Sequence, residues 1–197
     1  MDVLLLRFWR CLCLLRLILQ TDLSFNNLPS RVFILMENLA KPLTLSLLAH
    51  TGAQARVSPR LRQNHNLHQL TDRVQRFVNV LQPGTYVRPH CHRREVGRNG
   101  FELFAVLQGE LGVLILDKTG HVDQYFRVGG DPWGLELAEG VYHTLVALQP
   151  DTAILEIKEG PYEAASDKDF LPHFPLEGTA EAAALVQLWT GYFSHGR

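Results

Sequence analysis

From residue 76 onwards, the chain consists of short apolar runs separated by turn residues. Eight such runs lie within residues 76–158, and they are rich in β-branched and aromatic side chains. Breaks such as Pro83-Gly84, Gln108-Gly109 and Glu139-Gly140 recur every ~8–12 residues, as is typical of an antiparallel sandwich or small barrel. A parallel α/β sheet is excluded, because no helical crossover fits between the runs. The sequence therefore predicts an all-β jelly roll.

A short helix is expected on the N-terminal side of these strands. Residues 42–57 carry apolar side chains at helical spacing, and Pro42 suits the first turn of the helix. The following polar segment, residues 60–69, shows no clear period. Its histidines, His65 and His68, are candidate metal or substrate ligands, although a histidine on a loop is more often solvated.

A second short helix is expected at the C-terminal end. Thr179 is suited to the N-cap position of a helix over residues 179–193, and Leu185, Leu188 and Trp189 would form its apolar stripe. This stripe is expected either to pack on the domain or to form a homodimer contact. Before it, residues 159–178 are rich in Pro, Gly and Asp and predict a loop that wraps the domain.

Composition limits the classes of function. A chain of 197 residues with a net charge of -1 fits one domain and argues against a nucleic-acid-binding protein. The three cysteines form no zinc-ribbon spacing, so a reducing, cytoplasmic setting is expected.

The first 35 residues differ from the rest. Their apolar stretch is interrupted by Arg7, Arg10 and Arg16, which fits neither a transmembrane helix nor a signal peptide. We expect residues 1–35 to lie outside the fold, with Met36 as the start of the folded chain, and we expect no membrane attachment. The expected organisation is an N-terminal helix and polar segment (36–75), a barrel with the functional site (76–165) and a C-terminal loop and helix (166–197).

Four residues predict a metal site. His90 and His92 are one residue apart, so in a strand both side chains point to the same face. Glu102 opens an apolar run, where an ionised carboxylate is costly to bury without a partner. His143 opens another run, after the turn at Glu139-Gly140. Three imidazoles and a carboxylate are typical ligands of first-row metals; the alternative is that Glu102 forms a salt bridge with Arg88.

Strand alternation extends this prediction to the walls of the site. Tyr86 and Arg88 share the face of the two histidines, so we expect both to point into the barrel mouth as candidate catalytic residues. Phe104 and Val106 share the face of Glu102. Together with Arg88, the loop arginines Arg93, Arg94 and Arg98 favour a small anionic ligand such as a carboxylate or phosphate.

The spacing of these residues resembles the two cupin motifs. The first is Gly84-x5-His90-x-His92-x9-Glu102-x6-Gly109, with a lengthened gap before the glutamate, and the second is Gly134-x5-Gly140-x2-His143. Ala138 and Ala147 stand where proline and asparagine are common. From Met36 to the end, the segments SPRLRQNHNLH, VQRFVNVLQPGTYVRPHCH, FELFAVLQGELGVLILD and EIKEGPY are similar to the WbuC family of cupin-fold metalloproteins.

The resemblance implies a cupin double-stranded β-helix that binds one divalent metal (Fe, Mn, Zn or Ni) through His90, His92, Glu102 and His143. It also implies that Lys158, Glu159 and Tyr162 close the pocket. Because the namesake of the family belongs to bacterial O-antigen gene clusters, the expected ligand is a sugar or sugar nucleotide. Two alternatives stay open: a non-catalytic metal-dependent binding or sensor module, and a metal-free cupin sugar epimerase.

Overall fold

The computed structural model describes residues 40–194. The expectations for residues 1–35 and for Met36 lie outside this range. Within it, no helix is long and apolar enough to cross a membrane.

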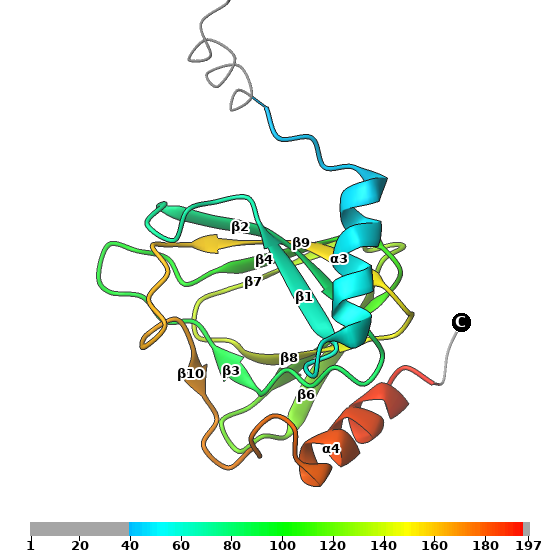
Figure 1. Cartoon of the computed structure of the whole chain (residues 1–197). Coiled ribbons are helices and arrows are strands. Elements are labelled where there is room, and N and C mark those ends of the chain that lie inside the picture. Colours follow the sequence, from blue (N-terminus) through cyan, green and yellow to red (C-terminus); the bar gives the residue numbers. More distant parts are fainter. Residues whose placement is uncertain (1–39, 195–197) are drawn as a thin grey trace, which may run out of the picture. The chain divides into compact units, whose positions relative to one another are not determined.

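The domain is built from two antiparallel sheets of five strands each, which form two layers (Figure 1). The first sheet has the order β1 (Arg62–Asn66), β2 (Val74–Leu81), β9 (Thr152–Glu159), β4 (Glu102–Gln108) and β7 (Gly134–Leu137). The second has the order β10 (Asp169–Phe170), β3 (His90–Cys91), β8 (Tyr142–Ala147), β5 (Leu111–Leu116) and β6 (Val122–Val128). Strands that are far apart in sequence are thus neighbours in each sheet, and the predicted all-β jelly roll with two short helices is confirmed.

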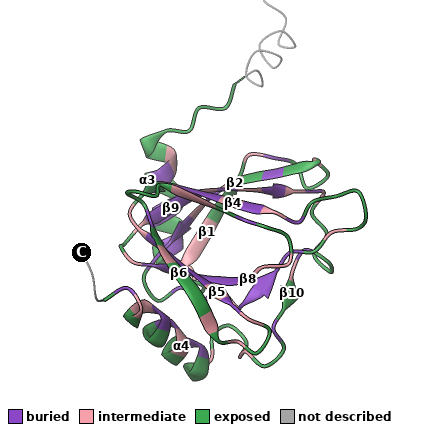
Figure 2. Ribbon diagram, turned by 180° about the vertical axis from the view of Figure 1, so that it is seen from behind, coloured by how far each residue is buried: buried purple, intermediate pink, exposed green. Residues whose placement is uncertain are grey.

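The main core lies between the two sheets. Strand alternation sends one set of side chains inward from each sheet, and these form a single cluster of Leu81, Val87, Phe104, Leu111, Val113, Val128, Leu137, Leu145, Ala147 and Ile154. Figure 2 shows the buried residues on the central strands and exposed residues on the outer sides of the helices. At about 25 cal/mol per Å² of apolar surface buried, this cluster is the main source of stability.

Helix α3 (Leu45–Val57) packs against the outer face of the first sheet through Leu48 and Ala55. It begins later than predicted, because the Thr44 hydroxyl accepts a hydrogen bond from the Leu47 amide (3.2 Å) and caps the helix there. Pro42 therefore precedes the helix instead of occupying its first turn.

Helix α4 (Ala180–Gly191) packs against the outer face of the second sheet. Thr179 is its N-cap, as predicted, and accepts a hydrogen bond from the Ala182 amide (3.2 Å). The buried stripe consists of Ala182, Val186 and Trp189. Leu188 is exposed, so its predicted place in the stripe is wrong.

Two strands escaped prediction because they lack an apolar pattern. β1 is a polar edge strand that pairs only with β2, and β10 is a two-residue strand inside the expected wrapping loop. Conversely, the expected strand over residues 85–92 forms ladder hydrogen bonds only at β3, and residues 83–89 have no regular structure.

Candidate metal centre

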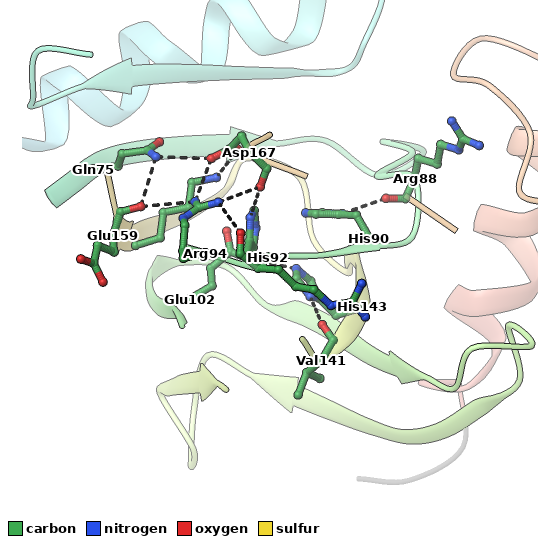
Figure 3. Close-up of polar contacts among 12 residues, drawn as sticks. Gln75, Arg88, His90, His92, Arg94, Glu102, Val141, His143, Glu159 and Asp167 are labelled. Atoms are coloured by element: carbon green, nitrogen blue, oxygen red, sulfur yellow. Dashed lines mark hydrogen bonds and ion pairs between the residues drawn. The ribbon is translucent and has the colours of Figure 1, made fainter. Parts of the chain in front are cut away.

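The four predicted ligands lie together at one end of the space between the sheets (Figure 3). His90 on β3 is directly opposite His143 on β8, and His92 follows β3 by one residue. Glu102 opens β4 in the other sheet. All four side chains are buried, and their ligand atoms lie within 4.8 Å of one another. The predicted convergence is therefore present in the structure.

Main-chain hydrogen bonds orient all three histidine rings. In each ring Nδ1 donates to a carbonyl oxygen, so the proton is placed on Nδ1 and the Nε2 lone pair is left free. The carbonyls belong to Arg88 for His90 (2.9 Å), to Val141 for His143 (3.0 Å) and to Asp167 for His92. Nε2 of His90 is buried without a hydrogen-bond partner within residues 40–194, whereas Nε2 of His143 faces the Glu102 carboxylate. Buried polar atoms are normally paired, and a ring lone pair beside a carboxylate oxygen needs a proton or a cation between them, so this arrangement fits a bound cation.

Glu102 completes the donor set. Its Oε2 lies 2.9 Å from His143 Nε2 and 3.1 Å from His92 Nε2. Burial alone would raise the pKa of Glu102, but in the absence of a metal the imidazoles of His92 and His143, when protonated, hold this pKa well below its usual range by charge and by hydrogen bonds from Nε2. The alternative salt bridge to Arg88 is absent, because that guanidinium donates to the carbonyls of Leu171 and Pro172.

The carbonyl that holds His92 belongs to a residue in a second buried cluster. The carboxylate of Asp167 accepts hydrogen bonds from Lys158 (2.8 Å), Arg94 (3.0 Å) and Gln75 (3.3 Å). These contacts fix the loop that carries the Asp167 carbonyl against the metal ligands. We call these four residues the Asp167 network; Asp167 and Gln75 were not predicted, because neither lies near a motif in sequence.

Two glycines let the chain pass close to His92. A Cβ on Gly100 would lie 2.7 Å from the His92 carbonyl oxygen. Gly140, with φ +79°, donates its amide to the same oxygen at 2.9 Å. The turn before β8 and the long loop before β4 thus both contact the main chain of a ligand residue.

The loop arginines do not surround the metal ligands. Arg94 is buried in the Asp167 network, and Arg93 is half-exposed over the ring of Tyr142. Arg98 is exposed. All three border a separate cavity of about 60 Å³. None of the three lines the larger cavity beside the metal ligands, and Arg94 is held instead by the buried carboxylate of Asp167.

A much larger cavity, of about 720 Å³, opens beside the ligands and is bordered by His90, Glu102 and His143. This volume lies in the range of small-molecule sites. Phe104 points between the sheets as expected, but it lies beneath this cavity, where its ring contacts that of His143 at 6.0 Å.

The two candidate catalytic residues occupy different places. Arg88 borders the large cavity, and its guanidinium points away from the histidines and lies over the ring of Phe170 at 5.1 Å (Figure 3). Tyr86 lies on the far side of the second sheet, stacked on Trp189 at 5.8 Å, and its hydroxyl donates to the Pro175 carbonyl. Burial raises the pKa of Tyr86 to about 12. Its expected position in the barrel mouth is wrong, since strand alternation does not apply to an unpaired segment.

Several other polar side chains border the large cavity. His68 is buried, with Nδ1 against the main chain of Arg76 and Nε2 without a partner within residues 40–194, whereas His65 is exposed. Glu156 faces the cavity beside Glu102; burial and then the charge of Glu102 raise the pKa of Glu156 well above its usual range. Of the residues expected to close the pocket, Lys158 and Tyr162 border it.

Comparison with known proteins shows related folds. Residues 43–128 match a family described as a domain of unknown function, DUF6016. No curated protein matches the chain.

Among solved structures, the chain is similar to KdgF from a Halomonas species (21% identity, TM-score 0.42, covering 55% of this chain and 87% of that one). It is also similar to a cupin superfamily protein from Desulfitobacterium hafniense (20% identity, TM-score 0.44, covering 62% and 94%). A third similar structure is Bacillus subtilis oxalate decarboxylase (20% identity, TM-score 0.41, covering 58% of this chain but only 30% of that one). The structural neighbours of this chain therefore include cupin superfamily proteins.

Proposed function

We propose that this protein is a cupin metalloprotein, which binds one divalent first-row transition metal and acts on a small polar or anionic molecule. One observation carries the proposal. Three buried histidines have Nδ1 bonded to the main chain and Nε2 directed at a shared point that also borders a buried carboxylate oxygen. This donor set matches the N and O ligands that such metals prefer.

When bound, the metal would act as a Lewis acid that polarises a carbonyl or activates a water molecule. His90, His92, Glu102 and His143 would hold it, and Fe, Mn, Zn and Ni all suit these ligands. Bacillus subtilis oxalate decarboxylase, one of the similar structures, has Mn(II) centres. In this protein all four metals remain to be tested.

The chain itself supplies the surroundings of the reaction. Glu156, at the wall of the cavity, presents a carboxyl group whose raised pKa favours the neutral acid. A neutral carboxylic acid can donate a hydrogen bond or a proton to a ligand. Arg88 borders the same cavity and stays a candidate for binding the ligand.

We further propose membership of the WbuC family and a role in bacterial surface-polysaccharide metabolism, with a sugar or sugar nucleotide as ligand, in the cytoplasm. The sequence resemblance supports this, and so do the amide side chains of Gln63, Asn64, Asn66 and Asn79 at the cavity wall, which suit hydroxyl groups. A homodimer through α4 is a further proposal, supported by exposed Leu188 on that helix.

The two alternatives make different demands on the site. A metal-free epimerase is less well supported, because it would leave Nε2 of His90 buried and unpaired within the described residues. A non-catalytic binding module would use the same metal and the same cavity. Only a search for turnover, with sugar nucleotides and small organic acids as substrates, separates it from an enzyme.

Metal analysis tests the proposal directly. Purified protein should contain close to one first-row metal per chain by mass spectrometry. His143→Ala should lower metal affinity by at least about 100-fold, because removal of a ligand costs more than loss of an outer partner. The exposed His121→Ala is the matched control and should keep the metal. Full occupancy in His143→Ala would refute the assigned site.

A further inference from the structure

The large cavity contains more positive than negative charge once a metal is bound. Five basic and four acidic residues line it: Arg60, Arg62, Arg88, Lys158 and Lys168, against Glu102, Glu156, Asp167 and Glu177. A divalent ion at the four-ligand site would add two further positive charges. Within a partly enclosed space of low dielectric constant, such an excess favours an anion.

Most of these cations already have partners. Arg60 and Arg62 both form salt bridges with Glu177, at 2.9 Å and 2.6 Å. Lys158 forms a buried salt bridge with Asp167 at 2.8 Å. These side chains hold parts of the protein together, so their charges are largely neutralised before any ligand enters.

Arg88 also has fixed partners. Its guanidinium donates to two main-chain carbonyls and lies over an aromatic ring. It therefore points away from the ligand histidines, as Figure 3 shows.

Lys168 is different. Its ammonium group takes part in no salt bridge and no side-chain hydrogen bond with any residue that the structure describes. The side chain is half-buried and borders the cavity. Burial lowers the pKa of Lys168, and the negative charges of Glu102, Glu156 and Asp167 lie close enough to oppose this effect.

The main chain on both sides of Lys168 is fixed. The preceding residue, Asp167, is held by the Asp167 network, and the next two residues form β10, which pairs Asp169 with Cys91 and Phe170 with His90. Lys168 is thus held at the cavity beside the ligand-bearing strand by rigid neighbours. Among the residues that the structure describes, no carboxylate forms a direct ion pair with this half-buried cation, so an anionic ligand beside it would compensate its charge.

The opposite wall offers hydrogen-bonding groups without charge. Asn64, Asn66 and Asn79 supply amide groups, and the Oδ1 of Asn79 and the Nε2 of His68 are buried without partners within residues 40–194. Amide and imidazole groups pair well with hydroxyl groups of a ligand. The cavity therefore combines an acid-binding side, near the metal, with a hydroxyl-binding side.

We propose that Lys168 binds the acidic group of the ligand, and that the ligand is a small hydroxylated oxyanion, a carboxylate or a phosphate. Its acidic group lies between Lys168 and the metal, and its hydroxyl groups face the amide wall. This inference rests on the proposed function, because the metal supplies the second positive charge. It transfers the anion-binding role from the loop arginines and Arg88 to Lys168.

Three probes with the same polyol chain test the ligand class: neutral glucitol, gluconate with a carboxylate, and glucitol 6-phosphate. Each is titrated by calorimetry into metal-loaded protein. At least one of the two anions should bind about tenfold or more tightly than glucitol, as expected for a charge-assisted contact. The tighter of the two identifies the acidic group. Equal binding of all three probes, or no binding, overturns the proposal.

Variants of Lys168 test the residue. Lys168→Met removes the charge but keeps the length of the chain, and it should weaken anion binding by about tenfold or more while leaving glucitol unaffected. Lys168→Arg should recover most of the affinity, because it restores the charge. Lys118→Met, at an exposed lysine, is the control and should bind as the parent does.

Metal content is measured in every variant, which separates this inference from the proposed function. If Lys168→Met keeps both its metal and its anion affinity, Lys168 is not the binding cation and the metal site stands. If the parent protein binds no metal, the proposed function fails first, and the inference falls with it.

Discussion

Two clusters of buried charge lie side by side in this protein, and they differ in the kind of polar atom that each leaves unpaired. In the Asp167 network, the carboxylate accepts hydrogen bonds from three side chains, and the buried atom without a partner within residues 40–194 is a donor, Nε of Arg94. In the metal centre, Nε2 of His90 is buried without a partner in the same part of the chain, and it is a lone pair because Nδ1 carries the proton. Burial and charge are common to both clusters, so neither identifies a functional site. The free lone pair of His90 does, because it needs a cation that the protein does not supply.

The comparison also separates two physical roles. The Asp167 network connects β2, β9 and the two loops around residues 94 and 167, so its hydrogen bonds and ion pairs stabilise the fold. The metal centre instead leaves a donor set ready for an added ion. We therefore expect changes in the first cluster to alter folding of the metal-free chain, and changes in the second to alter metal binding.

The largest expected effect on folding is at Asp167. Asp167→Ala should lower the free energy of unfolding of the metal-free protein by about 3–5 kcal/mol, because it leaves Lys158 and Arg94 buried without a counter-ion. Urea denaturation measures this. Asp169→Ala is the matched control; Asp169 is half-exposed and 3.8 Å from Arg93, so the loss should be at most about 1 kcal/mol. Similar losses in both variants would show that the network is not the stabilising cluster.

Acid should act on the two clusters in different pH ranges. Histidine ligands must be deprotonated to bind a metal, so metal occupancy should fall as the pH falls from 7 to 5. Burial alone would raise the pKa of Asp167, but the charge and hydrogen bond of Lys158 and the hydrogen bond of Gln75 lower it. A lowered pKa means that the contribution of Asp167 is present above the ordinary value of about 3.9 and is lost only below it.

The test compares the metal-free parent with Asp167→Asn by thermal unfolding, and metal retention by dialysis. Between pH 7 and pH 5 the difference in Tm between the two proteins should stay constant while metal is released. A difference in Tm that disappears in this range would mean that the two clusters titrate as one.

The smallest effect is expected at Arg98, an exposed residue of the long loop. Arg98→Ala should change the free energy of unfolding by no more than about 0.5 kcal/mol and leave metal content unchanged. Arg94→Ala, in the same loop, should destabilise the protein as strongly as the change at Asp167. Urea denaturation of both variants would show whether loop position or burial decides the role of an arginine.

The fold and the metal ligands could be predicted from the sequence because both depend on local patterns. The short apolar runs at 102–108 and 111–116, separated by turn residues, predicted the strands β4 and β5. The single-residue spacing of His90 and His92 and the isolated carboxylate at Glu102 likewise marked the ligand set. In each case the relevant physics acts over a few residues along one strand.

The surroundings of the site could not be predicted from the sequence, because they depend on contacts between segments that are distant in the chain. Asp167 and Lys168 lie in a loop whose path is set by pairing of β10 with β3, and no local period predicts that pairing. Tyr86 was misplaced for a related reason: it lies in an unpaired segment, to which the alternation of a strand does not extend. Arg93, Arg94 and Arg98 lie in the same loop, and nothing in the sequence separates them. Only the tertiary contacts of Arg94 with Asp167 show that it is the buried one.

The hydrogen bonds of the three histidines have a consequence for how the site tolerates change. Each ring is oriented by a carbonyl oxygen of the main chain, and every residue has this carbonyl whatever its side chain is. The side chains at 88 and 141 can therefore vary without altering the direction in which the rings point, provided that the chain keeps its path; at 167 the carboxylate itself holds that path. In a comparison of related sequences, conserved side chains around the ligands would therefore not show which carbonyl groups orient the rings. Conserved lengths of the loops that carry these carbonyls would show it.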